Sequence, residues 1–258
     1  MIQTNINPIR RNEIKQIVYK TLCNYQPPCI PVKIKSLVRS FPQIRLIAYS
    51  KHMHKMNISY KQMLCLAGTM DAYTDYYAHE DLYIIYYNDI EKSITLSNRY
   101  RWDIAHELGH IMLSHHKLYS KTRIFRNKLS KQEYDVLEAE ADYFAQLILV
   151  PHVVLYAFKI RTATQLKDLC QISGPAATRR FYAYRQWKNN IDGSDAYDRP
   201  LFHYYYNFIY KKNCHICGAH FIQCTGKYCP ICGNKSLKWG DGEMKYITKI
   251  NLNENGKA

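Results

Sequence analysis

Residues 101–113, R-W-D-I-A-H-E-L-G-H-I-M-L, contain the side chains around which the rest of the chain is organised. His106 and His110 stand four positions apart, and residues at this spacing lie on one face of an α-helix. Both imidazoles can therefore bind one metal ion. Glu107 is offset from His106 by about 100° around the helix axis, so its carboxylate can reach a water on that ion without being a ligand. The stretch predicts a helix that carries a catalytic metal site.

A second helix, at residues 132–150 and ended by Pro151, is expected to supply a third protein ligand. Glu138 and Glu140 are the candidates. Glu138 shares a helix face with Asp142, four positions further on, whereas Glu140 lies about 160° from Asp142 around the axis. We therefore expect Glu138 to bind the metal and Glu140 to face solvent. Asp142 is expected to orient a ligand histidine through a hydrogen bond.

The segment before the metal helix predicts a sheet. Residues 82–89, L-Y-I-I-Y-Y-N-D, are rich in β-branched and aromatic side chains and form the strongest predicted strand. A strand beside a metal helix is where zinc peptidases lay the backbone of their substrate. Other elements are predicted around it: strands at 44–49 and 93–96, and helices at 9–24, after Pro31, and at 57–65.

Two motifs resemble the ImmA/IrrE family of metallo-endopeptidases: R-W-D-I-A-H-E-L-G-H-I-M-L-S-H-H at 101–116 and E-A-E-A-D-Y-F-A-Q-L-I-L-V-P at 138–151. That family pairs an A-H-E-L-G-H helix with an E-x-x-A-[N/D]-x-F-A-x-x-L-L-x-P helix. The chain has L-I-L-V-P where L-L-M-P is commoner and W-D where F-T is common, and neither change touches a metal ligand. The resemblance covers residues 9–160.

For the active centre, the resemblance implies a catalytic zinc ion bound by His106, His110 and Glu138, with Glu107 as the general base. The zinc ion would lower the pKa of a water molecule toward about 7. Glu107 would accept the proton as that water attacks a peptide carbonyl, and would then pass it to the leaving amine. The donor for the developing oxyanion is left open among four candidates: His115, His116, His152 and a tyrosine of the strand. Each of the three histidines is expected at the surface.

The segment after the two metal helices predicts a helix–turn–helix. Residues 161–190 read as two helices with a tight turn at 172–174, and the second helix is basic. Its arginines are Arg179, Arg180 and Arg185. Because ImmA/IrrE-like proteins commonly carry a helical region after the peptidase, a packing or substrate-docking role is favoured over DNA reading. Residues 192–200 are polar and predict a linker.

Four cysteines near the C-terminus are spaced as C-x2-C-x11-C-x2-C: Cys214, Cys217, Cys229 and Cys232. Each pair is followed by a glycine, which lets the chain fold back so that backbone amides face the thiolates. The pattern predicts a zinc ribbon with a structural Cys₄ zinc ion and no open position for catalysis. Three further candidates lie off the paired spacing and are interpreted as non-ligands: His215, His220 and Cys224.

The composition of the whole chain limits where it acts and what it binds. No run of 18 apolar residues occurs, and the first residues lack an apolar signal region, so we expect a cytoplasmic protein with no membrane segment. The net charge of +15 permits nucleic-acid binding, but no Lys/Arg run exceeds two residues, and this partner is not favoured.

The sequence thus predicts an α+β fold of three parts. These are a zincin-like metallopeptidase domain at 1–160, a helical, helix-turn-helix-like extension at 161–198 and a small zinc-ribbon domain at 199–258, with one catalytic and one structural zinc ion. The resemblance implies a site-specific endopeptidase of phages, mobile elements or stress regulation that cleaves a helix-turn-helix repressor. The alternative is a DNA-binding regulator that uses the ribbon and the basic helix, with a vestigial peptidase site. The intact set of ligands and base favours the enzyme.

Overall fold

The computed structural model of the chain describes residues 6–24, 28–90, 99–118, 123, 129–190, 197–210, 212–214, 216–221, 228–235 and 237–238. The helices are α1 (Pro8–Cys23), α2 (Ile34–Arg39), α3 (Tyr49–Met56), α4 (Tyr60–Ala67), α5 (Arg99–Met112), α6 (His115–Leu118), α7 (Lys131–Leu149), α8 (His152–Ala157), α9 (Ala163–Cys170), α10 (Gly174–Asn190) and α11 (Asp198–Ile209). The strands are β1 (Ile44–Ala48), β2 (Ala72–Tyr77), β3 (Leu82–Tyr87), β4 (Lys212–Cys214), β5 (His220–Phe221) and β6 (Leu237–Lys238). The predicted α+β class is confirmed.

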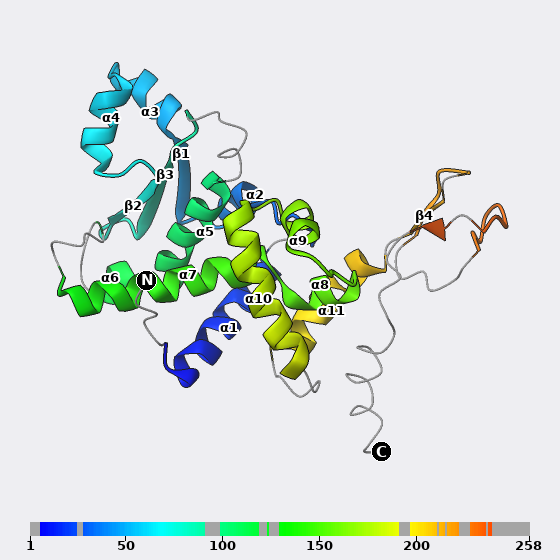
Figure 1. Ribbon diagram of the computed structural model, residues 1–258. Coiled ribbons are helices and arrows are strands. Elements are labelled where there is room, and N and C mark those ends of the chain that lie inside the picture. Colours follow the sequence, from blue (N-terminus) through cyan, green and yellow to red (C-terminus); the bar gives the residue numbers. More distant parts are fainter. Residues whose placement is uncertain are drawn as a thin grey trace.

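The larger sheet has the order β1-β3-β2, with β3 parallel to β1 and antiparallel to β2. Side chains of β3 alternate between two cores, as the period of a strand requires. Tyr83, Ile85 and Tyr87 are buried in the main core, whereas Tyr86 joins a smaller cluster with residues of α3 and α4. Figure 1 shows α3 and α4 on the far side of this sheet from α7. Both faces of β3 are therefore covered, which agrees with its apolar sequence.

The two long helices α5 and α7 pack closely against each other. A Cβ atom at Gly109 would lie 3.1 Å from the Cα and the carbonyl oxygen of Ala141 and 3.2 Å from Phe144. Only a residue without a side chain fits at this contact without moving α7. Ser130 begins α7 with a capping box to Glu133. Because Gly109 and Ala141 are small, α5 and α7 lie close enough for side chains of both helices to bind one metal ion.

The helix–turn–helix region is packed into the main core. Thr162 begins α9 with a capping box, and α10 begins four residues after the end of α9. Four side chains of α9 and α10 are buried in the same core as α5 and α7: Leu166, Cys170, Ala177 and Tyr184. This extension therefore shares one core with α5 and α7.

The segment between the extension and the cysteines differs from the prediction. A linker was expected at 192–200, but α11 begins at Asp198, whose carboxylate accepts a hydrogen bond of 2.7 Å from the Trp187 indole. Leu201, Phe202 and Tyr205 of α11 are buried in the main core. The segment expected as the ribbon domain, 199–258, therefore begins with a helix of the main core.

Two elements before the metal helix were not predicted. Helix α3 directly follows β1, so the strand expected at 44–49 ends at Ala48. Strand β2 has four buried residues in succession, from Ala72 to Asp75, and lacks the alternation that reveals a strand. The helix expected at 57–65 begins later, because Ser59 caps it. The strand expected at 93–96 lies outside the described residues.

No helix in the described part of the chain is both long and apolar enough to cross a lipid bilayer.

Candidate metal centre

His106, His110 and Glu138 converge on one point between α5 and α7. The two Nε2 atoms are 3.0 Å apart, and each lies 3.4 Å from an oxygen of Glu138. One ligand atom from each residue can be chosen so that all lie within 4.8 Å of one another. Two imidazole nitrogens and one carboxylate oxygen are donors that suit Zn²⁺, with a coordination position left for another ligand. The donor set therefore fits a catalytic zinc ion.

The outer nitrogen of His106 has its own partner. Nδ1 of His106 lies 3.0 Å from a carboxylate oxygen of Asp142. An ionised carboxylate can only accept, so Nδ1 carries the proton and Nε2 is left with a lone pair for a metal. Burial lowers the pKa of His106, but the hydrogen bonds of Asp142 and Glu138 outweigh burial and raise this pKa well above its usual value.

A chain of buried polar groups stands behind His110. Its Nδ1 is 2.8 Å from Nδ1 of His115, and Nε2 of His115 is 3.1 Å from Glu140. Arg10 of α1 donates two hydrogen bonds to the same carboxylate, of 2.7 and 3.0 Å. The carboxylate accepts from Nε2–H of His115, so Nδ1 of His115 accepts in turn from Nδ1–H of His110. This proton order leaves the lone pair of His110 on Nε2, which faces the metal position.

The expectation that Glu140 faces solvent is wrong. Glu140 is 7% exposed and joins α7 to α1 and α6. Burial alone would raise its pKa, but hydrogen bonds from His115 and Arg10 lower the pKa to about 2. Helix geometry correctly predicted that Glu140 and Asp142 lie on different faces of α7. It could not predict that the face of Glu140 packs against Arg10, which is 130 residues away in the sequence.

Glu107 lies beside the metal position and is held by β2. Its Oε2 accepts a hydrogen bond of 2.7 Å from the Thr74 hydroxyl. Burial raises the pKa of Glu107, and the nearby His106 and the Thr74 hydroxyl oppose this rise. Glu138 shows the opposite balance: burial would raise its pKa, but hydrogen bonds from the two histidines lower it. Glu138 is therefore ionised as a ligand must be, whereas Glu107 has a raised affinity for a proton.

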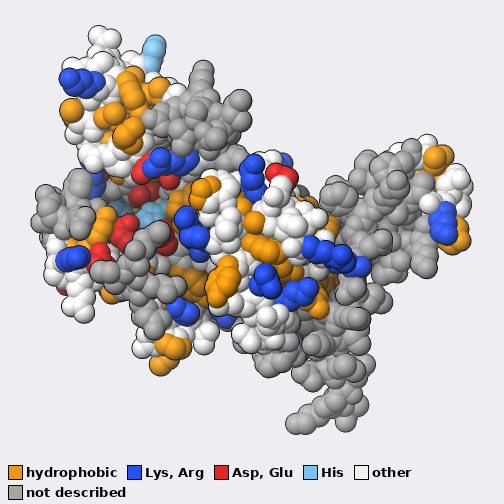
Figure 2. Space-filling model, in the orientation of Figure 1, with side chains coloured by type: hydrophobic (Ala, Val, Ile, Leu, Met, Phe, Trp, Pro, Cys, Tyr) orange, Lys and Arg blue, Asp and Glu red, His pale blue; other side chains and the backbone are white. Residues whose placement is uncertain are grey.

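A pocket of about 770 Å³ opens over these groups. Figure 2 shows it as a hollow with histidine and carboxylate side chains at its floor and basic side chains beside it. Ala72, Tyr73 and Thr74 of β2 line it, together with residues of α5, α7 and α10. The strand at the pocket is therefore β2, the edge strand. The strand expected there, at 82–89, is β3, the central strand.

The candidates for the oxyanion donor are separated by the structure. His115 and His116 are buried, so their expected surface position is wrong. Both nitrogens of His115 lie within hydrogen-bond distance of His110 and Glu140, and His115 does not line the pocket, whereas His116 does. His152 packs against Tyr184 and Trp187, away from the metal position. Among the histidines considered, His116 is the one at the pocket.

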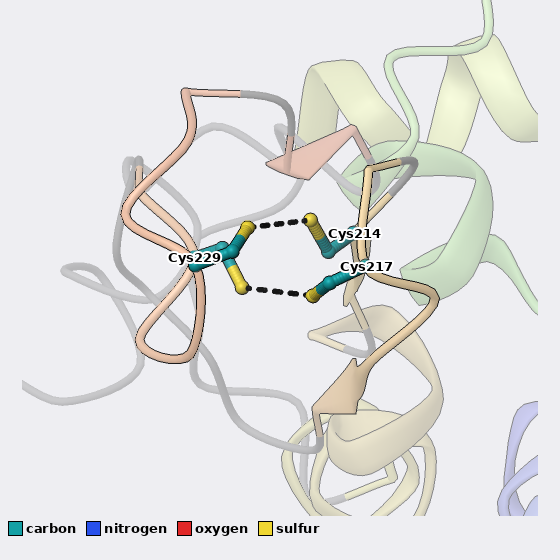
Figure 3. A group of neighbouring side chains, drawn as sticks. Cys214, Cys217 and Cys229 are labelled. Atoms are coloured by element: carbon teal, nitrogen blue, oxygen red, sulfur yellow. Dashed lines mark hydrogen bonds between the residues drawn. The ribbon is translucent and has the colours of Figure 1, made fainter.

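The four paired cysteines form a second group. The Sγ atoms of Cys214 and Cys232 are 3.5 Å apart, and those of Cys217 and Cys229 are 3.6 Å apart. Tetrahedral zinc with Zn–S bonds of about 2.3 Å places its sulfurs roughly 3.8 Å apart. In Figure 3, the labelled cysteines face one another across two loops. The donor set and its spacing fit a closed zinc site.

The two cysteine loops repeat one backbone geometry. Gly218 and Gly233 both have φ of +71°, and each donates a backbone hydrogen bond to the first cysteine of its own pair, at 3.0 and 2.9 Å. Strands β4, β5 and β6 form a three-stranded sheet beside the loops. This small sheet and the cysteine cluster confirm the predicted zinc ribbon. Two of the cysteine and histidine residues interpreted as non-ligands, His215 and Cys224, lie outside the described residues, as does the side chain of His220.

Two histidines and a glutamate at the floor of an open pocket define a metal-dependent hydrolase centre. Residues 61–181 match the family model of the IrrE N-terminal-like domain, Peptidase_M78. This segment is a zinc-dependent metallopeptidase domain of the ImmA/IrrE family, which confirms the resemblance. A search of curated proteins finds no match to the chain.

Proposed function

We propose that the chain is a zinc-dependent endopeptidase whose catalytic zinc ion is held by His106, His110 and Glu138. The observation that carries this proposal is the convergence of these three donors at the floor of a pocket, with the Glu107 carboxylate beside them. When bound, the ion polarises a peptide carbonyl and acidifies a water molecule. Each ligand histidine keeps its proton on the nitrogen that faces away from the ion, through Asp142 in one case and His115 in the other.

Glu107 is proposed as the general base. Thr74 holds its Oε2, so Oε1 is the atom that accepts the proton from the attacking water and later gives it to the leaving amine. Burial raises the pKa of Glu107, which makes the carboxylate a better proton acceptor than an exposed one. The fixed carboxylate also removes the need to reorient the base during the reaction.

The backbone of the substrate is proposed to lie along β2. Among the described residues this strand pairs with β3 alone, and its residues 72–74 form part of the pocket wall. An extended peptide can therefore add to the edge by backbone hydrogen bonds, which would place a carbonyl near the metal position. Specificity would then come from side-chain pockets on either side of the scissile bond.

The family resemblance supports a helix-turn-helix repressor as the substrate. The test is co-expression with a small helix-turn-helix protein where a neighbouring gene encodes one, comparing the wild type with Glu107→Gln. We expect the repressor to be cut at one position by the wild type and to stay intact with the variant. If the repressor stays intact in both strains, it is not the substrate. If it is cut equally in both strains, Glu107 is not the general base.

The remaining expectations concern the ribbon and the location of the protein. We infer that the ribbon zinc ion stabilises the C-terminal part and takes no part in cleavage, because four thiolates close its coordination. A domain division near Tyr210 is proposed in place of residue 199, since α11 packs in the main core. A cytoplasmic location is proposed because the paired C-x-x-C spacing is typical of metal sites in a reducing compartment.

A further inference from the structure

Helix α10 forms one wall of the metal pocket. It belongs to the helix-turn-helix-like extension, whose basic character first suggested DNA. The pocket residues from α10 and the turn before it are Ile172, Ser173, Ala176, Arg179 and Arg180. Two of the three arginines noted in the sequence therefore face the metal centre, which does not favour the DNA-binding alternative. The extension contributes to whatever the pocket binds.

Arg180 is fixed in place by both metal helices. Its guanidinium lies over the ring of Trp102 on α5, 5.0 Å from the centroid, and Nη1 donates a hydrogen bond to Gln146 on α7. Its Nε atom is buried and has no hydrogen-bond partner among the described residues. A guanidinium held by stacking in this way keeps part of its donor fork for another group.

Arg180 has no ion pair with a carboxylate in the described part of the chain, although the charge of Asp142 acts on it and raises its pKa. Three other arginines have such ion pairs: Arg10 with Glu140, Arg99 with Asp71 and Arg123 with Asp75. Burial lowers the pKa of Arg180 to about 10, which shows that its surroundings disfavour the cation. A desolvated cation without a counter-ion is costly, and an incoming anion would remove much of that cost.

Arg179 adds a second positive charge to the same wall. It is exposed, lines the pocket and has no ion pair among the described residues. Asp142 is the nearest acidic influence on Arg180, but it already accepts a hydrogen bond from His106. The two arginines therefore line the same pocket as the ligand His106.

We propose that Arg180, assisted by Arg179, binds a carboxylate of the substrate peptide next to the scissile bond. This proposal rests on the proposed peptidase function and names a feature of its substrate. A guanidinium fork matches the two oxygens of a carboxylate, and acidic groups are the anions that peptides carry. The carboxylate has two sources, an Asp or Glu side chain or the free C-terminus of a peptide.

The first experiment uses the zinc-loaded full chain and synthetic peptides. A mixed peptide library with acetylated N-termini and amidated C-termini is cleaved, and the products are sequenced by mass spectrometry. We expect Asp or Glu to be enriched at one position near the cut bond. A parallel library with free C-termini distinguishes the two sources, because terminal recognition would place every cut at a fixed distance from the C-terminus. No charge preference in either library would overturn the proposal.

Variants then assign the preference to the arginines. Arg180→Gln should lower the ratio of kcat/KM for the best acidic peptide to kcat/KM for its Asn or Gln counterpart by about tenfold or more. Arg180→Lys should recover part of the loss, and Arg179→Gln, an exposed change, should cause a smaller loss. Arg185→Gln is the matched control, since Arg185 is exposed on α10 and does not line the metal pocket. An unchanged preference in Arg180→Gln and Arg179→Gln would contradict the proposal.

A binding measurement separates this inference from the catalytic one. Zinc-loaded Glu107→Gln should bind the acidic peptide at least about tenfold more tightly than its amide counterpart, and adding Arg180→Gln should remove the difference. If the wild type cuts no peptide but this difference is present, the peptidase function fails and the carboxylate site stands. If cleavage occurs but affinities are equal, the carboxylate site fails alone.

Discussion

The two candidate metal centres of this chain are built in opposite ways. The His106/His110/Glu138 centre lies between long helices, and its ligands are held by hydrogen bonds to Asp142 and through His115 to Glu140. The Cys₄ centre lies between short loops whose strands are two or three residues long. One centre is positioned by a fold that already has a core. Among the described residues, the loops of the other centre are joined by the four cysteines and a sheet of strands two or three residues long.

This difference agrees with the proposed roles of the two centres, catalytic for the histidine centre and structural for the cysteine centre. A centre whose ligands are fixed by surrounding residues can keep an open coordination position without losing its geometry. A centre with four thiolates has no open position, and its binding free energy is also the folding free energy of the loops. The same metal can therefore be a reagent at one place in the chain and a cross-link at the other.

Removal of metal by a chelator should produce the largest contrast. We expect amides of 212–238 to lose protection from hydrogen exchange, because structural zinc contributes on the order of 10 kcal/mol to small zinc domains. Amides of α5 and α7 should stay protected, since their packing is apolar. Adding zinc back should restore the ribbon. Protected ribbon amides in the metal-free chain would contradict the contrast.

Glu140→Ala should destabilise the catalytic scaffold by about 3 kcal/mol at pH 7, because it leaves His115 and Arg10 without their buried carboxylate. The folded-state pKa of Glu140 lies at about 2, below that of an unfolded chain. Its contribution is therefore present above about pH 4.5 and is lost as the pH falls toward 2. Urea unfolding of wild type and variant between pH 7 and pH 3 checks this.

The control for that prediction is Glu13→Ala. Glu13 pairs with the same Arg10 but is exposed on α1, so its removal should cost well under 1 kcal/mol at any pH. The difference in the free energy of unfolding between wild type and Glu140→Ala should become smaller in acid. If it stays constant, the ionised carboxylate of Glu140 is not the source of the stability.

Gly109→Ala should destabilise the chain by about 1–2 kcal/mol, since overpacking against backbone atoms outweighs the better helix propensity of alanine. Moving α7 away from α5 should also weaken zinc binding at the histidine centre alone. Gly174→Ala is the matched control, because a Cβ atom there meets nothing within 4 Å. Thermal unfolding and zinc competition measure both effects, and equal behaviour of the two variants would contradict the close contact.

Thr74→Val should have the smallest effect, a loss of about tenfold in kcat/KM with zinc content unchanged. The change keeps the shape of the side chain and removes the hydroxyl that holds Glu107. Thr69→Val, a change in the same pocket wall that does not touch Glu107, is the control. A variant at Thr74 that cleaves at the wild-type rate would show that β2 does not position the base.

The features that were predictable from the sequence are local ones. The spacing of His106 and His110 and of Glu138 and Asp142 follows from helix geometry, and the structure places these pairs as that geometry requires. The paired cysteines follow from the same kind of short-range rule. Each of these features needs only a few neighbouring residues, and none depends on how distant segments pack.

The features that were not predictable depend on distant segments. Glu140 is buried because Arg10 comes from another helix, and the sequence offered one signal, the pair of histidines directly after the metal helix. Strand β2 was missed because both of its faces are covered. The direction of Arg180 was missed because α10 packs over Trp102, and the sequence of α10 alone does not show which face is covered.

The assignment of different roles to the two centres is tested most directly by counting zinc ions and measuring peptide cleavage in three full-length proteins. We expect two zinc ions per chain and cleavage in the wild type, one ion and no cleavage in His106→Ala, and one ion with cleavage retained in Cys214→Ser. Cleavage by His106→Ala, or its loss in Cys214→Ser with the histidine centre still loaded, would contradict the assignment of a catalytic and a structural zinc site.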